Sequence, residues 1–114
     1  MRMFKNNLNL EMTRGDTFGF GVSIIDLGTE LDSAYFTVKN NYDDDTIIFE
    51  KTLDDGIVLD HVENNDYYYK VRIAPEDTEN LEPRKYFYDF EISVNGDRYT
   101  LLKGVLDVEY DVRG

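Results

Sequence analysis

The sequence predicts an all-β protein, an antiparallel β-sandwich of about seven or eight short strands in one domain that covers residues 1–114. Apolar and polar residues alternate with period two along most of the chain, and the 3.6-residue period of an amphipathic helix is almost absent. Clusters of Asn, Asp and Gly separate the alternating runs at intervals of roughly 8–12 residues, which favours a sandwich over a barrel. With 114 residues, 41% of them hydrophobic, the chain can bury its own core.

The side of each predicted strand that faces the core follows from its alternation. The even-numbered positions are apolar in 17–24 and 85–94, and the odd-numbered positions are apolar in 67–73. The segment between the last two, with a proline near each end, has room for one short helical turn. We predict strands at 17–24, 34–39, 46–51, 56–61, 67–73, 85–94 and 97–112, with a short alternating piece at 8–12 before them.

The last two strands form a predicted hairpin. Asn95 and Gly96 tolerate the positive φ angles of a type I′ turn. Leu101 and Leu102 cannot both face the core, so we expect Gly104 to mark a β-bulge. After the bulge, the inward register should resume at Leu106, Val108, Tyr110 and Val112.

One tyrosine makes the sandwich more specific. Immunoglobulin-like domains carry a "tyrosine corner", a Tyr at the start of the sixth strand whose hydroxyl bonds to the preceding crossing segment. Tyr86 stands at this place, and Tyr88 takes the position of the second core cysteine of antibody domains. The alternative is that both are ordinary core aromatics. The sequence thus predicts an immunoglobulin-like β-sandwich.

Charge and composition exclude several kinds of partner. The formal net charge is -12, and no stretch concentrates Lys and Arg, so nucleic acid and anionic membranes are poor partners. The chain has no cysteine, which excludes disulfides and thiolate chemistry. The first residues lack the apolar core of a signal peptide, and no run is long enough to span a bilayer. We expect synthesis in the cytoplasm.

The residues do not predict an enzyme, a cofactor or a metal. His61 is the only histidine, and a lone histidine at a strand end is usually solvated or hydrogen-bonded. No Gly-x-Ser-x-Gly motif surrounds a serine. The acids of 43–45 and 54–55 offer oxygen ligands for calcium, but their spacing differs from that of a calcium loop. We expect these acids to lie in solvated turns.

Three aromatic residues are candidate interface residues. Tyr68 and Phe87 should point outward from their strands, and Tyr42 lies in a predicted loop. Exposed rings stack on sugars or anchor protein interfaces, so a carbohydrate- or host-surface-binding module is the alternative function. Because Tyr68 and Phe87 belong to strands expected in different sheets, we favour two separate protein contacts.

The stretch "TRGDT" contains Arg14, Gly15 and Asp16, the tripeptide that many adhesion proteins present to integrins. Such recognition needs an exposed, flexible loop tip, whereas here the tripeptide lies between two strand pieces. We expect Gly15 to form a bend, Asp16 to accept backbone N–H bonds and Arg14 to pair with a nearby acid.

Three stretches, "MTRGDTFGF" (12–20), "APEDTENL" (74–81) and "KYFYDFEISVNGDRYTLLKGVLDVEYDV" (85–112), resemble the immunoglobulin-like domain at the amino terminus of phage baseplate upper proteins and related prophage tail proteins. The resemblance implies a virion structural module that docks onto the tail tip or baseplate. Its partners would be other tail proteins or further copies of itself. An unpaired edge, at 46–51 or in the last strand, would add to a partner sheet. The sequence ends at Gly114 without the long extension of larger family members, which leaves a role in carrying receptor-binding parts open.

Overall fold

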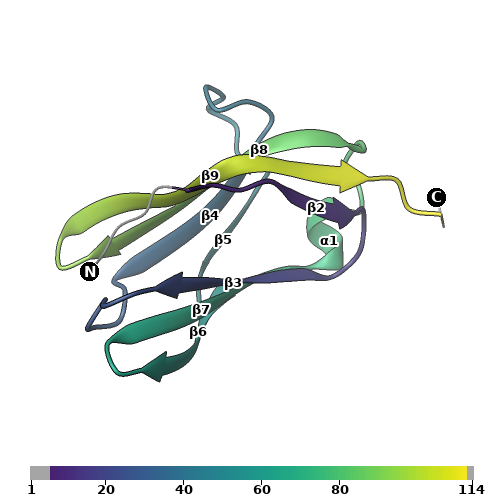
Figure 1. Ribbon diagram of the computed structural model, residues 1–114. Helices are drawn as coiled ribbons and strands as arrows, with labels where there is room; N and C mark the ends of the chain where they lie inside the picture. The colour runs from purple at the N-terminus through teal and green to yellow at the C-terminus, as the bar shows by residue number, and fades with distance from the viewer. Residues whose placement is uncertain (1–5, 113–114) are drawn as a thin grey trace.

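Alternating side chains build a structure made almost entirely of strands. The computed structural model describes residues 6–112, and Figure 1 shows their arrangement. The elements are β1 (Asn6–Asn7), β2 (Leu10–Thr13), β3 (Phe18–Ile24), β4 (Ser33–Lys39), β5 (Phe49–Leu53), β6 (Gly56–Glu63), β7 (Asp66–Ile73), α1 (Pro75–Thr78), β8 (Arg84–Val94) and β9 (Asp97–Glu109). The all-β prediction is confirmed. Because α1 has only 4 residues, the described part of the chain has no helix that could cross a membrane.

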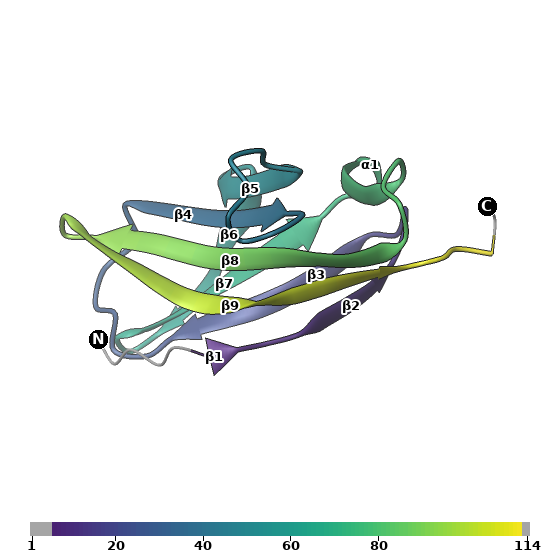
Figure 2. The ribbon, with the colours of Figure 1, turned by 90° about the horizontal axis from the view of Figure 1, so that it is seen from above.

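The strands form two layers of an immunoglobulin-like sandwich (Figures 1 and 2). One layer has the order β9-β8-β4-β5, and the other has the order β6-β7-β3. A short parallel pairing of Thr52 with Gly56 and Leu53 with Ile57 joins β5 to β6, so that the sheet is continuous. These orders correspond to strands G-F-C-C′ and D-E-B of an immunoglobulin domain.

The first strand piece is divided in two, which raises the number of strands above the predicted seven or eight. β1 and β2 both run parallel to β9, one after the other along its outer edge. The pairing of β2 brings Leu10 and Met12 into the core, where they are 8% and 5% exposed. No other described strand pairs with the free edge of β3.

The core lies between the two layers and consists of the inward-facing residues of the alternating strands. Every even-numbered residue of β8 from Tyr86 to Val94 is buried, and in β7 Tyr69, Val71 and Ile73 are buried. Phe36 of β4 is fully buried and packs against the rings of Phe20 and Tyr88. The predicted inward faces of β3, β7 and β8 are confirmed.

The tyrosine corner is also confirmed. The hydroxyl of Tyr86 donates a hydrogen bond of 2.7 Å to the carbonyl oxygen of Glu82, in the segment that crosses to β8. Tyr88 is 1% exposed, and its hydroxyl donates a bond of 2.6 Å to the carbonyl oxygen of Leu8. Tyr88 therefore fixes the segment between β1 and β2 to the core.

The last strand differs from the prediction in two ways. The bulge does lie in this stretch, but Leu101 is the extra residue, since Phe90 pairs with Leu102 and Glu91 with Thr100. Beyond Leu106 and Val108, which are buried, the inward register does not continue: Tyr110 is 77% exposed and Val112 is fully exposed. The reason is that β9 ends at Glu109 and the chain leaves the sheet, as Figure 1 shows.

Gly104 has a role other than the predicted bulge. It is buried where the N-terminal segment crosses β9, and a Cβ atom placed there would overlap the carbonyl oxygen of Leu8. Close backbone approach is a general reason for glycine within a strand. The turn residues Asn95 and Gly96 have φ angles of 53° and 85°, which confirms the predicted positive-φ turn.

The third predicted strand begins and ends later than expected. The predicted strand 46–51 is observed as Phe49–Leu53, because residues 40–48 form a long loop. β9 is covered by β1 and β2, so the edge predicted in the last strand is not free. β5 pairs with β6 only through Thr52 and Leu53, so the unpaired edge predicted at 46–51 is confirmed in part: among the described strands, none covers residues 49–51 on that side.

Candidate docking surfaces

The "TRGDT" stretch forms a tight turn between β2 and β3, and two distant segments, 78–81 and 109–111, hold it in place. The Arg14 guanidinium donates bonds of 3.2 and 2.9 Å to the Asp111 carboxylate and one of 3.3 Å to the Leu81 carbonyl oxygen. Gly15, at φ 79°, donates its N–H to the hydroxyl of Thr78. The predicted bend and the pairing of Arg14 with an acid are confirmed.

Asp16 behaves differently from the expectation. Its own N–H donates to the carbonyl oxygen of Thr13, which closes the turn, and its side chain is exposed. Within residues 6–112 its carboxylate accepts no hydrogen bond, so the expected bonds to backbone N–H groups are not formed. Integrin recognition requires both side chains to extend from an exposed loop tip. Arg14 is instead bound to Asp111 and Leu81, so of the two only Asp16 is exposed at the turn.

The short helix α1 connects this turn to strand β5, through Thr78 on one side and Asp77 on the other. Thr78 is completely buried and accepts the Gly15 N–H through its hydroxyl, at 2.9 Å. Asp77 accepts the Ala74 N–H at 2.7 Å and forms an ion pair of 2.6 Å with Lys51 of β5. Both side chains of this pair are more than four-fifths buried, so the crossing segment is held at the end of the sandwich.

Tyr42 and Phe87 form one aromatic surface patch, which we call the Tyr42–Phe87 patch. Their ring centroids lie 4.6 Å apart with an interplanar angle of 50°, and Lys103 places its ammonium 4.8 Å above the Tyr42 ring. The Tyr42 hydroxyl donates to the Gly104 carbonyl oxygen at 3.0 Å, although 44% of the residue is exposed. Burial, and then the charge of Asp89, raise the pKa of Tyr42.

Asp89 is the charged neighbour of this patch, in the outer row of β8. Burial is the main cause of its raised pKa, and Glu91 adds to it, whereas the nearby Lys39 and Lys103 lower it. The net direction is upward, so ionised Asp89 is less stable in the fold than in water. A hollow of about 30 Å³ lies beside these residues, enough for a water-sized group.

Tyr68 lies on the other layer, apart from the Tyr42–Phe87 patch. It stacks on His61 of β6 with a centroid distance of 4.3 Å and an interplanar angle of 9°. His61 in turn lies 2.7 Å from the Asp60 carboxylate, and this contact is the main cause of the lowered pKa of Asp60. The structure does not bring Tyr68 and Phe87 together, so they form no shared flat platform for a sugar.

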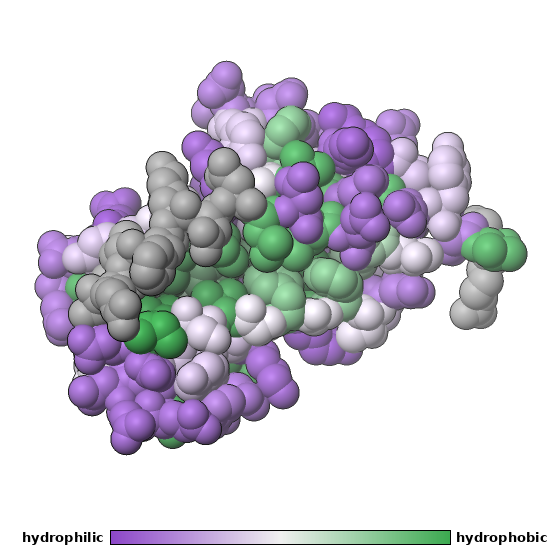
Figure 3. Space-filling model, in the orientation of Figure 1, coloured by the Kyte–Doolittle hydropathy of each residue, from purple (hydrophilic) through white to green (hydrophobic). Residues whose placement is uncertain are grey.

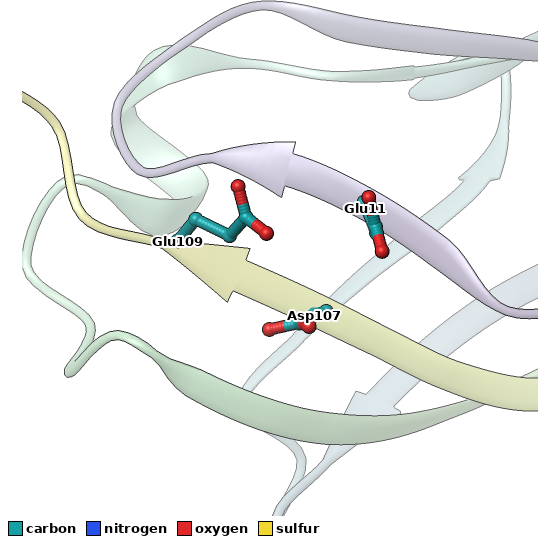
Figure 4. A group of neighbouring side chains, drawn as sticks. All are labelled: Glu11, Asp107 and Glu109. Carbon is teal, nitrogen blue, oxygen red and sulfur yellow. The ribbon is translucent and has the colours of Figure 1, made fainter.

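Three carboxylates that no sequence motif connects lie close together. Figure 4 shows Glu11 of β2 beside Asp107 and Glu109 of β9, with one oxygen of each within 4.8 Å of the others. The parallel register sets Glu11 directly opposite Asp107. The acids lie about 96 residues apart in sequence, so only the β2–β9 pairing could have revealed them. Like charges at such distances repel one another.

The acids considered for calcium from the sequence lie in turns. Asp54, at φ 65°, and Asp55 lie in the β5–β6 turn and are exposed. In the loop before β5, Asp43 and Asp45 are exposed and Asp44 is half-buried, and the Asp44 N–H closes a turn with Asn41. These acids are not part of the described carboxylate cluster.

The fold and these surfaces define an immunoglobulin-like β-sandwich that presents aromatic and charged patches on both layers. Neither a scan against protein-family models nor a search of curated proteins finds a match for this chain.

Proposed function

We propose that this protein is a non-enzymatic structural module of a phage or prophage tail, of the baseplate type, that docks other virion proteins. The support comes from the resemblance of three stretches to immunoglobulin-like domains of such tail proteins, together with the immunoglobulin-like strand order. The surfaces described above would act by complementarity of shape and charge.

One observation carries this proposal: the three stretches of the resemblance meet at one end of the sandwich. Arg14, from 12–20, binds Leu81 of 74–81 and Asp111 of 85–112. Gly15 binds Thr78, also within 74–81. Residues that fix one another in space are expected to recur together wherever this version of the fold occurs. The resemblance thus concerns a connected structural unit rather than three unrelated short matches.

The Tyr42–Phe87 patch is the surface that we assign to protein contact. It joins the loop before β5 to β8, and the ring of Tyr42 is already held by Lys103 and by the Gly104 carbonyl. A partly ordered aromatic side chain loses little entropy when a partner covers it. Two tilted rings beside a lysine fit a protein surface better than the flat face of a sugar.

Localisation tests the proposal directly. Phage particles induced from the strain that encodes this protein would be purified and labelled with gold-coupled antibodies raised against it. We expect gold at the tail end of the particles and co-purification of other tail proteins. Absence from purified particles, while the protein is abundant in the cell, would refute the proposal. Binding to a glycan array that is lost in Tyr68→Ala would instead support the sugar-binding alternative.

A further inference from the structure

The edge of β3 is the strongest unpartnered feature of the described structure. This strand of 7 residues pairs with β7 on one side, and among residues 6–112 no strand covers its other side. In immunoglobulin domains of the constant type, the first strand lies beside the second, in the order A-B-E-D. Here the segment that could serve as the first strand, β1 and β2, pairs with β9 instead. The position beside β3 is left free.

The inner face of this edge is apolar. Phe18 and Phe20 point toward the core but are only partly buried, in contrast to Val22 and Ile24 further along the strand. Figure 3 shows apolar residues gathered along this face, over β3 and between β3 and β2. An added strand would place its inward side chains against these two rings and remove them from water.

The outer face of the same edge has no side chains at two positions. Gly19 and Gly21 lie opposite Arg72 and Lys70 of β7, so the two cations border a trough of about 490 Å³ whose floor is glycine backbone. Arg72 is exposed and forms no ion pair with an acid of residues 6–112, and Lys70, 65% exposed, has only a contact of 3.4 Å with Asp60. In a chain of net charge -12, this is a local concentration of positive charge.

Because Gly19 and Gly21 have no side chains, the free edge of β3 has open access to Lys70 and Arg72 of β7. A strand added beside β3 lies two strand spacings, roughly 10 Å, from β7. Ordinary side chains on β3 would fill that gap, but above Gly19 and Gly21 it is open. An acidic side chain of the added strand can therefore extend across β3 and meet Lys70 or Arg72.

We propose that the β3 edge binds, by strand addition, an extended segment of a second protein in which acidic residues alternate with apolar ones. The apolar residues would cover Phe18 and Phe20, and the acidic residues would lie over the glycines against Lys70 and Arg72. A second copy of this chain does not fit this chemistry, because its β3, FGFGVSI, has no acidic residue to place against Lys70 or Arg72. The inference deepens the docking role proposed above by naming the chemistry of a partner.

Peptide binding to the isolated protein tests this inference. The probe is a capped peptide as long as β3 in which glutamates alternate with valines, and its control carries lysines in place of the glutamates. Backbone amide NMR shifts and hydrogen exchange would locate the bound peptide. We expect saturable binding that protects amides of residues 18–24 and weakens as salt is added, and no binding of the lysine peptide.

Two variants separate the edge and the charges. Gly21→Val fills the trough, and because its Cβ would lie 3.8 Å from the Tyr69 carbonyl oxygen, an ordinary contact, the fold should be retained. Arg72→Glu reverses a charge at the trough, and Arg98→Glu makes the same change at the exposed β8–β9 hairpin. We expect each of the first two to weaken peptide binding about tenfold and Arg98→Glu to leave it unchanged.

The opposite results would overturn the inference. These are equal binding of the glutamate and lysine peptides, protection at β9 instead of β3, or unchanged binding by Gly21→Val. A dimer of the unmodified protein that Gly21→Val dissociates, observed by sedimentation, would assign the edge to a second copy instead. None of these results depends on phage particles, so failure here would leave the localisation test of the tail role intact.

Discussion

The replacement Gly104→Ala tests whether the N-terminal segment is seated on β9 by close backbone contact. A Cβ atom at this position would overlap the Leu8 carbonyl oxygen and lie 3.2 Å from the ring of Tyr88. Both neighbours are fixed, because Leu8 donates its N–H to Lys103 and its carbonyl accepts the Tyr88 hydroxyl. The added methyl group must therefore displace the segment between β1 and β2.

The expected cost follows from these contacts. Overpacking in a buried site costs about 1–3 kcal/mol, and the two hydrogen bonds of Leu8 contribute about 1 kcal/mol each. The reduced freedom of the unfolded chain returns about 0.4–1 kcal/mol. We expect Gly104→Ala to lower the free energy of unfolding by about 3 kcal/mol. At a urea dependence of about 2 kcal/mol/M, the unfolding midpoint falls by about 1.5 M.

Gly21→Ala is the matched control, because Gly21 also lies within a strand but a Cβ there would lie 3.8 Å from its nearest neighbour. Its urea midpoint should stay the same or rise slightly. Urea unfolding followed by circular dichroism measures both variants. If Gly104→Ala unfolds at the same urea concentration as Gly21→Ala, the proposed contact between Leu8 and β9 does not constrain the fold.

Three further predictions concern the aromatic corner and the outer row of β8. Tyr86→Phe should lower the free energy of unfolding by about 1 kcal/mol through loss of the bond to Glu82, as thermal unfolding would measure. Burial raises the pKa of Tyr88 to about 12, so stability should be fully present below pH 10, where the unfolded tyrosine begins to ionise, and fall as the pH rises toward 12. Urea unfolding across this range should show a smaller loss in Tyr88→Phe. Because the pKa of Asp89 is raised, its ionised form destabilises the fold; Asp89→Asn should raise the urea midpoint at neutral pH, with a gain that disappears in acid below the ordinary aspartate pKa.

The sequence was most informative where structure depends on neighbouring residues. The alternation of β8 predicted five buried side chains, and the Asn95-Gly96 dipeptide predicted the turn that follows. Both depend on the period of a strand or the φ angles of a turn, which the local sequence determines. Tyr86 could be predicted as a corner because its hydroxyl reaches back only four residues, to Glu82.

Features that depend on distant strands could not be predicted in the same way. Gly104 was expected to mark a bulge, but it is required by Leu8, a residue 96 positions earlier that β9 holds in parallel register. The same pairing creates the carboxylate cluster of Glu11, Asp107 and Glu109. The prediction that Tyr110 faces the core was also wrong, because an alternating pattern does not show where a strand leaves its sheet. Period two identifies strands without identifying their neighbours.

The β3 edge shows how charge can control which partner an exposed strand accepts. An unpaired strand with partly exposed aromatic residues is ordinarily an aggregation hazard. In this chain the net charge of -12 opposes unspecific association of like copies, while Lys70 and Arg72 supply local positive charge beside the edge. The β3 strand of a like copy would also offer these two cations no acidic side chain. Acidic partners supply that charge, so Lys70 and Arg72 favour the proposed occupant over a second copy.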